Sequence, residues 1–194
     1  MRIPKTRKGI ETVEKILNAS IEVIEEKGFM NTSISDITKR ANVAYGVFYY
    51  YFNNKYELFD ELVRKANREM RYYLKIKTEN IQSRIEKEKV GIREFLKWIR
   101  ENKDYYKLFI EAHVHRPNML IWHYTKLAER YSIGLSEAMR RGEIINVDPE
   151  VLSYVLIGIS EILGKRYVVW NNDEIPNHVI TEADKIIENL LKPK

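Results

Sequence analysis

The chain has no cysteine among its 194 residues, which excludes zinc–thiolate sites, redox dithiols and thiol nucleophiles. A reducing compartment is the one that such a composition favours. Apolar runs such as Val155–Ile159 are far shorter than the roughly 20 residues needed to span a bilayer, and the first residues lack the apolar segment of a signal peptide. We therefore expect a soluble, cytoplasmic protein without a membrane partner.

Sequence patterns typical of catalysis are also missing. None of the serines follows a nucleophile-elbow pattern, and no glycine-rich phosphate loop is present. His113 and His115 are two residues apart, so on a helix they point to opposite sides, and no cysteine or close carboxylate completes a metal site with them or with His123. We expect no enzyme activity, no metal and no cofactor.

Acidic residues are absent from the first eight residues, although the net charge of the whole chain is only +5. This segment contains Arg2, Lys5, Arg7 and Lys8. Two interpretations are equally good: a basic arm that lies along DNA phosphates or enters a minor groove, and a solvated tail.

The segment from Gly28 to Leu58 has the pattern of a helix-turn-helix. Ser33, with Asp36 three residues later, forms a capping pair, so a short helix is predicted to begin at about Ile34. It ends near Asn42, a residue type that tolerates left-handed backbone angles.

The second helix of this motif has one apolar side and one side rich in tyrosine. Val47, Phe48 and Phe52 lie on the core side. The other side carries Tyr45, Gly46, Tyr49 and Tyr50. A helix of this kind fits the major groove, where side chains near its N-terminus contact base edges. The alternative is a three-helix core whose tyrosines are half-buried on a partner protein.

A second capping pair, Asn54 and Glu57, starts a long helix at Lys55. The N-terminus of a long helix favours phosphate, which makes Lys55 a candidate phosphate contact. This helix is predicted to run to about Arg84, because no glycine or proline interrupts it.

The first 60 residues resemble the DNA-binding domain of TetR-type transcriptional regulators. The residues that carry the resemblance are Gly28, Phe29, Thr32, Ser33, Ile34, Asp36, Ile37, Ala41, Val43, Gly46, Phe48, Tyr49, Tyr51, Phe52 and Lys55. The chain departs from the pattern where many members have glycine, serine and alanine, because it has Asn42, Ala44 and Thr38 there. Without that serine one possible phosphate contact is lost.

The resemblance implies how individual side chains meet DNA. It places Tyr45, Gly46, Tyr49 and Tyr51 on the DNA, brings Ser33 and Ser35 close to its backbone, and sets Lys55 on a phosphate. Helical phasing puts Tyr51 near the edge of the buried side instead, so the two arguments differ there. The resemblance also implies an all-helical dimer whose C-terminal part binds a small inducer.

Beyond the motif the sequence predicts helices throughout. The fold class expected is all-α with about nine helices, divided into residues 1–54, an arm and DNA-binding domain, and 55–194, a ligand-binding and dimerisation domain. A first helix covers Val13 to Ile24 and stops at Gly28. The later helices are predicted at 90–102, 104–115, 117–141, 149–171 and 177–191.

The helix at 149–171, which Asp148 and Pro149 begin, has almost no polar side. A helix that is apolar all round must be buried, and the same helix of a second copy is the most economical cover. Together with the last helix it predicts a four-helix dimer interface. The interface residues expected are Leu156, Gly158, Ile159, Ile162, Ala183, Ile187 and Leu190. The alternative is burial of this helix within one monomer.

Aromatic residues are concentrated in the middle of the chain, where several are candidates for the wall of a ligand pocket. The residues expected there are Trp98, Tyr106, Phe109, His113, Trp122, Tyr131 and Trp170. Residues 104–141 and 148–170 resemble TetR-like regulators that sense fatty acyl-CoA or related lipids. The effector implied is small and largely apolar or aromatic, such as a fatty acyl-CoA.

Two functional hypotheses follow. The first is a homodimeric repressor that binds a palindromic operator in double-stranded DNA and is released by its effector. The second is a helical small-molecule-binding or interaction protein whose helix-turn-helix is structural.

Overall fold

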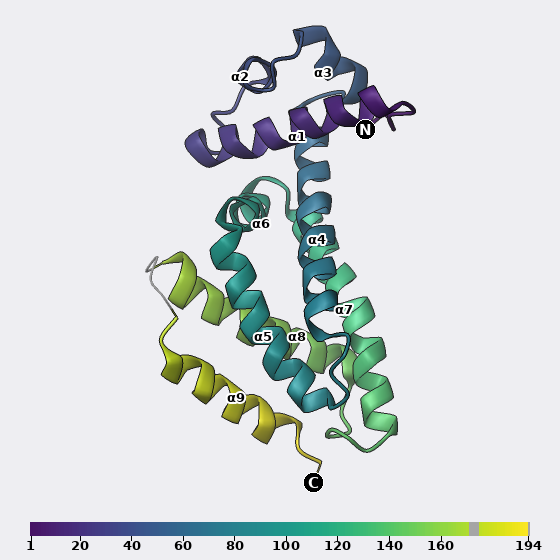
Figure 1. Ribbon diagram of the computed structural model, residues 1–194, viewed down its shortest axis with the longest axis vertical. Helices are drawn as coiled ribbons and strands as arrows, with labels where there is room; N and C mark the ends of the chain where they lie inside the picture. The colour runs from purple at the N-terminus through teal and green to yellow at the C-terminus, as the bar shows by residue number, and fades with distance from the viewer. Residues whose placement is uncertain (171–174, 194) are drawn as a thin grey trace. The chain divides into compact units, whose positions relative to one another are not determined.

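The computed structural model describes residues 1–170 and 175–193. These residues form nine α-helices and one short π-helix and contain no strand, which confirms the all-α prediction (Figure 1). The helices are α1 (Arg7–Lys27), α2 (Ile34–Arg40), α3 (Tyr45–Tyr51), α4 (Lys55–Thr78), α5 (Arg84–Glu101), α6 (Lys103–His115), α7 (Pro117–Arg140), α8 (Pro149–Gly164), the π-helix η1 (Lys165–Val169) and α9 (Asn177–Leu191).

Several helix ends lie where local signals predict them. Gly28 follows α1 with a φ of 75°, a backbone conformation that glycine adopts without steric cost. At the start of α8, the Asp148 carboxylate accepts a hydrogen bond of 2.8 Å from the Val151 amide, and Pro149 is in the first turn.

Two predicted helix ends are wrong. The long helix that begins at Lys55 ends at Thr78, not near Arg84, and the next helix begins at Arg84, not at residue 90. The Ser83 hydroxyl caps α5 by accepting from the Glu86 amide at 3.4 Å. Ser83 and Glu86 have the same residue types and spacing as a capping box, although only the Ser83 hydroxyl bond is formed, so the signal for this break was present in the sequence.

The predicted helix at 149–171 is shorter and changes type. It is α-helical to Gly164 and then π-helical to Val169, while Asn171 lies outside the described residues. Gly164 lies against α5: a Cβ there would be 2.5 Å from the Ile99 Cδ1 atom. A side chain at this position would therefore displace the end of the Ile99 side chain.

The chain divides into two compact units by contacts. The first unit contains residues 1–67 and 104–121, and the second contains 68–103 and 122–194. The first unit is therefore larger than the predicted DNA-binding domain, because it also includes the first half of α4 and almost all of α6. The ligand-binding and dimerisation role of residues 55–194 stays a prediction.

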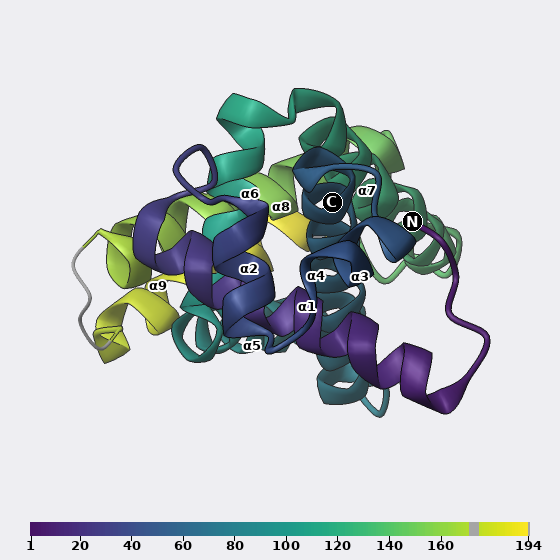
Figure 2. The same cartoon turned by 90° about the horizontal axis from the view of Figure 1, so that it is seen from above.

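Aromatic packing and ionic contacts hold the first unit together. α2 packs on α1 and on α3 (Figure 2). Phe29, in the loop after α1, packs against Phe59 of α4 with ring centroids 4.4 Å apart. Arg116 donates two hydrogen bonds, of 2.7 and 2.6 Å, to the Asp60 carboxylate. This bidentate pair connects the end of α6 to α4.

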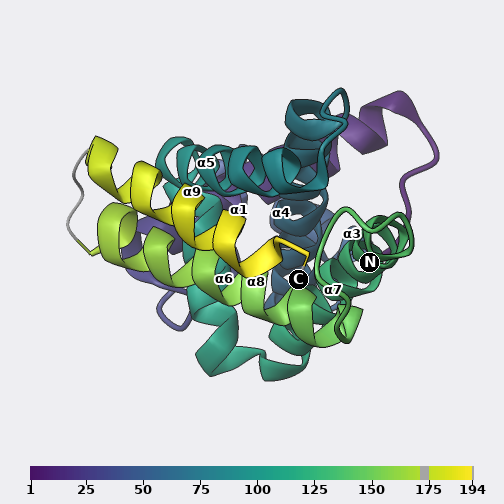
Figure 3. The same cartoon turned by 90° about the horizontal axis from the view of Figure 1, so that it is seen from below.

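The core of the second unit is aliphatic. α5 contacts both α8 and α9 (Figure 3). The buried side chains that form this core are Ile92 and Leu96 of α5, Leu135 and Ala138 of α7, Ile144 of the loop between α7 and α8, Leu152 and Leu156 of α8, and Ile187 and Leu191 of α9. No helix in the ranges 1–170 and 175–193 combines the length and apolarity required to cross a bilayer.

A buried polar cluster lies at the edge of this core. Glu88 of α5 accepts hydrogen bonds from the Arg84 guanidinium and from the Tyr131 hydroxyl of α7. Glu88 and Arg84 side chains are only 5% and 11% exposed. Burial raises the pKa of the Glu88 carboxyl, while the nearby Arg84 charge and the two hydrogen bonds act in the opposite direction. Burial and the neighbouring Glu88 raise the pKa of Tyr131 as well.

Candidate nucleic-acid interface

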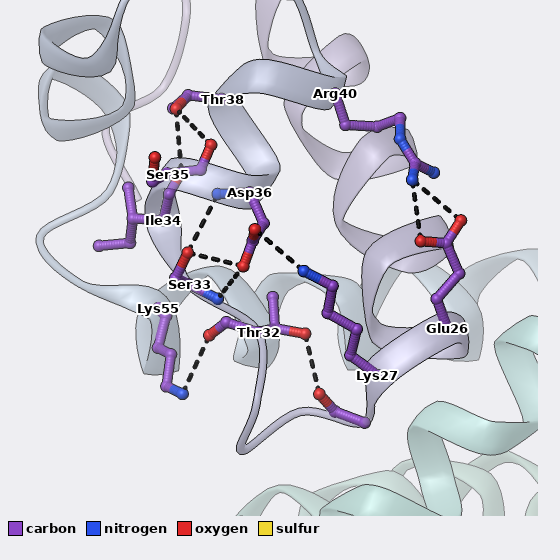
Figure 4. Close-up of polar contacts among 11 residues, drawn as sticks. Glu26, Lys27, Thr32, Ser33, Ile34, Ser35, Asp36, Thr38, Arg40 and Lys55 are labelled. Atoms are coloured by element: carbon purple, nitrogen blue, oxygen red, sulfur yellow. Dashed lines mark hydrogen bonds and ion pairs between the residues drawn. The ribbon is translucent and has the colours of Figure 1, made fainter.

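A reciprocal capping box starts α2, as predicted. The Ser33 hydroxyl accepts from the Asp36 amide at 3.1 Å, and the Asp36 carboxylate accepts from the Ser33 amide at 3.1 Å and from its hydroxyl at 2.7 Å (Figure 4). The Lys27 ammonium lies 3.0 Å from the same carboxylate. The Ser33 hydroxyl bond and then the Lys27 bond lower the pKa of Asp36 below its ordinary value. The box therefore ties the start of α2 to the end of α1.

Arg40 connects the other end of α2 to α1. Its guanidinium donates to the Glu22 carboxylate at 3.0 Å and to both Glu26 oxygens at 2.9 and 2.8 Å (Figure 4 shows the Glu26 pair). The Glu26 bonds, followed by the Glu22 bond, raise the pKa of Arg40. Ionic contacts thus join α2 to α1 at both ends of α2.

The turn between α2 and α3 depends on Asn42, whose φ of 52° is in the left-handed region. The Val43 amide then donates to the Thr38 carbonyl at 3.0 Å. Asparagine tolerates this conformation better than most residues, so the departure from glycine at this position leaves the turn intact.

α3 presents an exposed surface that we call the tyrosine face, formed by Tyr45, Gly46, Tyr49 and Tyr50. The three tyrosines are 53%, 48% and 54% exposed, although Phe48 on the opposite side is fully buried. The hydroxyls of Tyr45 and Tyr49 lie 3.3 Å apart, and that contact raises the pKa of Tyr49. A Cβ added at Gly46 would meet nothing within 4 Å. The tyrosine hydroxyls and rings thus lie around the exposed backbone of Gly46. Hydroxyl groups can bond to base edges, and the flat rings can contact thymine methyl groups.

Tyr51 is on the buried side of α3, 9% exposed. Helical phasing therefore places this ring better than the family resemblance does, and a contact between its hydroxyl and DNA stays a prediction. Ser35 is exposed on α2, whereas the Ser33 hydroxyl is already used in the capping box. Their approach to the DNA backbone is likewise untested.

Lys55 has a role that the sequence does not indicate. Its ammonium donates to the backbone carbonyls of Phe29, Met30 and Thr32 at 3.2, 3.0 and 3.2 Å. The Thr32 contact is visible in Figure 4. An ammonium has three hydrogens, so a DNA phosphate would have to replace one of these carbonyls. Lys55 holds the α1–α2 loop to the start of α4, and its predicted phosphate contact remains a hypothesis.

We expect Lys55→Met to destabilise the protein by about 1.5–3 kcal/mol, because three carbonyls lose a charged donor. The salt dependence of DNA binding should stay the same as in the parent, since no phosphate contact is removed. Thermal unfolding and binding titrations across salt measure the two effects. Lys39→Met, which removes an exposed cation of α2, is the control for stability. A salt slope lower by about one would instead make Lys55 a phosphate contact.

The predicted ligand-binding aromatics do not share one environment. Trp98, Tyr106 and Phe109 are buried, and the rings of the last two are packed edge to face with centroids 6.3 Å apart. The Tyr131 hydroxyl donates a hydrogen bond to the Glu88 carboxylate. His113 and Trp170 are exposed, and Trp122 is half-buried.

These residues also divide between the two compact units. Tyr106, Phe109 and His113 belong to the first, and Trp98, Trp122, Tyr131 and Trp170 belong to the second. Their role in ligand binding stays a prediction.

The predicted interface residues Leu156, Ala183 and Ile187 are buried within the second unit, and their place in a dimer interface stays a prediction. α8 is apolar on two sides, one against this core and one exposed. Gly158 and Ile162 lie on the exposed side, whereas Ile159 and Leu190 pack partly against the core.

Other exposed residues complete that side of α8. Val151, Tyr154 and Val155 are exposed and recur with Gly158 and Ile162 at helical spacing. Ile186 is an exposed apolar residue of α9. The sequence did not indicate which side of α8 would face the core, because both sides are apolar. We call the set Val151, Tyr154, Val155, Gly158 and Ile162 the exposed stripe of α8.

Comparison with known proteins agrees with this geometry. Residues 16–62 match the family model of the bacterial regulatory proteins of the tetR family. The chain is 55% identical over 53 residues to YvdT, an uncharacterised helix-turn-helix transcriptional regulator of Bacillus subtilis; the match covers 27% of this chain and 26% of YvdT.

Two solved structures are similar over nearly the whole chain. GusR of Salmonella enterica has a TM-score of 0.81 at 17% identity, covering 96% of this chain and 98% of GusR. The fatty acid degradation regulator FadR of Bacillus halodurans has a TM-score of 0.78 at 18% identity, covering 95% and 96% of the two chains. At these identities the likeness shows a shared fold.

Proposed function

We propose, because this chain belongs to the TetR family of transcriptional regulators, that it is a homodimeric repressor that binds a palindromic operator through the tyrosine face and leaves it when a small apolar effector binds. The tyrosine face carries this proposal. Three tyrosines stay exposed around Gly46 on a helix whose other side is buried, and α2 is fixed beneath that helix by ionic contacts at both ends. A rigid support under an exposed polar surface suits sequence recognition.

The dimer is proposed from the exposed stripe of α8. Its apolar side chains recur over three turns of one helix, and a two-fold axis through the stripe would bring together the same patch of each copy. Two copies of α3 would then be presented to two operator half-sites.

The effector is proposed to be largely apolar, with a fatty acyl-CoA as the leading candidate class. FadR of Bacillus halodurans, which has the same fold, is described as a fatty acid degradation regulator, and this supports the proposed class of effector. Such an effector acts only if it binds one conformation of the regulator more tightly than the other.

Fluorescence anisotropy with DNA from upstream of the chain's own gene tests this function. Binding should be tight, should weaken steeply with salt and should resist competitor DNA. A pool of acyl-CoAs should release the DNA. Weak binding that competitor removes would favour the alternative function, a helical ligand-binding or interaction protein whose helix-turn-helix is structural.

We expect Tyr45→Ala to reduce the preference for operator over unrelated DNA by about 1–3 kcal/mol, the value of one good base contact. Binding to unrelated DNA should change little, because the substitution removes no charge. Competition titrations with both DNAs measure the preference. Tyr72→Ala, which truncates an exposed tyrosine of α4, is the matched control. Equal preference in Tyr45→Ala and the parent would refute the assignment of the tyrosine face.

A further inference from the structure

The segment before α1 is folded against the end of α3. The Arg2 amide donates to the Tyr51 carbonyl at 2.8 Å, and the Arg2 guanidinium carbon lies 4.3 Å from the centroid of the Tyr50 ring. The first contact holds the backbone of the segment and the second holds its side chain. This arrangement differs from the solvated tail that was one of the two interpretations of the sequence.

A second set of contacts holds the same segment where it enters α1. The Thr6 hydroxyl caps α1 by accepting from the Gly9 amide at 3.1 Å. A Cβ added at Gly9 would lie 3.1 Å from the Tyr51 hydroxyl and 3.2 Å from both Pro4 and Thr6. The segment therefore passes close to the buried ring of Tyr51, and Arg2 has a defined position beside the tyrosine face.

The charge of Arg2 is not neutralised by a neighbour. Within the part of the chain that the structure describes, no carboxylate lies within 4 Å of its guanidinium, whereas Arg7 pairs with Glu11 at 3.0 Å and Arg40 pairs with two glutamates. A guanidinium stacked on a ring still directs its N–H groups outward in its own plane. Arg2 thus presents several donors and a full charge beside Tyr50.

We propose that Arg2 contacts a DNA phosphate and that Tyr50 positions it, so that the segment before α1 is part of the DNA-binding surface. This inference rests on the proposed function. A phosphate is the group on DNA that matches an unpaired planar cation, and such contacts add affinity for every sequence equally. Tyr50 then serves as a support for Arg2 at the edge of the tyrosine face.

The test compares Arg2→Ala with the parent by anisotropy across salt, on poly(dI–dC) and on the upstream DNA. Affinity should fall about tenfold on both DNAs, and the salt slope should fall by about one for each protomer bound. Arg7→Ala removes the same charge from the first residue of α1, next to this segment. Because the Arg7 guanidinium is already paired with Glu11, this variant should change the slope by less than half as much.

Two further variants test the support given by Tyr50. In a double-mutant cycle of Arg2→Ala and Tyr50→Leu, the double variant should lose less affinity than the two single losses together. Arg2→Lys keeps the charge without the planar group, so it should recover most of the slope and only part of the affinity. If the affinity losses of the two single variants simply add in the double variant, the proposal that Tyr50 positions Arg2 is overturned.

Each result separates this inference from the proposed function. If the parent binds and Arg2→Ala has the parent's slope, only the Arg2 contact is overturned. If Arg7→Ala lowers the slope as much as Arg2→Ala, diffuse charge accounts for the effect and the contact is again overturned. If Arg2→Ala changes the preference between the two DNAs, Arg2 contacts bases and the phosphate assignment fails. A parent that binds neither DNA would overturn both proposals.

Discussion

Gly158→Glu should convert the proposed dimer to a monomer and lower affinity for the proposed operator by at least about 100-fold. Gly158 lies within the exposed stripe of α8, where the proposed two-fold axis would bring two introduced carboxylates close together without a cation. Desolvating unpaired charges in an apolar interface costs several kcal/mol, enough to change a dissociation constant by orders of magnitude. Sedimentation velocity measures the oligomeric state, and anisotropy measures operator binding.

Gly158 has open space for a side chain, so the effect of Gly158→Glu on the protomer itself should be small. A Cβ at this position meets nothing within 4 Å, so the new side chain does not disturb the protomer, and glutamate favours a helix more than glycine does. Gly91 of α5 also has open space around it, so Gly91→Glu adds the same charge at a second helical glycine and should leave the dimer intact. A Gly158→Glu protein that sediments as a dimer would refute the interface.

Arg84→Met should destabilise the protein by about 3–5 kcal/mol, because it leaves the buried Glu88 carboxylate without its cation. For a chain of this size that corresponds to a fall in Tm of about 6–20 °C. Arg93→Met makes the same substitution on the same helix, but Arg93 is 43% exposed where it pairs with Asp184. That control should cost less than about 1 kcal/mol.

The stability loss of Arg84→Met should depend on pH. Burial raises the pKa of Glu88 above its ordinary value of 4.5, so the folded state holds this proton more tightly than the unfolded state. The protonated Glu88 carboxyl contributes to the free energy of unfolding below about pH 4.5. This contribution is lost as the pH rises through the pKa of Glu88 in the folded state. Without Arg84 that pKa rises further.

The gap between Arg84→Met and the parent should therefore be wider at pH 8 than at pH 5. Denaturant unfolding at the two pH values measures this difference. A deficit that is the same at both, or no larger than that of Arg93→Met, would show that Arg84 does not compensate the Glu88 charge.

Where the structural signal is local, sequence reasoning placed the helices well. Gly28 ends α1, Ser33 and Asp36 start α2, and Asp148 caps α8, because each of these interactions joins residues within four positions of one another. The break between α4 and α5 was also marked by a local signal, because the residues that cap the start of α5, Ser83 and Glu86, are three positions apart in the sequence.

The candidate site was predicted in part for the same reason. The period of α3 alone separates the exposed Tyr45, Tyr49 and Tyr50 from the buried Phe48, and it places Tyr51 near the buried side. The helical period gives no information about the partners of Lys55 and Arg2. The carbonyls that Lys55 contacts lie 23–26 residues away along the chain, and the carbonyl that Arg2 contacts lies 49 residues away. Contacts of that separation depend on how helices pack.

The sequence by itself determined an all-helical protein with a TetR-type helix-turn-helix, because periodicity and capping act within one or two turns. Only the tertiary structure decided which apolar side of α8 enters the core, that Tyr131 binds Glu88, and that Lys55 holds a loop. An apolar or basic residue has the same local pattern whether it meets its own chain, a second copy or DNA. Its partner is set by the three-dimensional packing of residues distant in the chain.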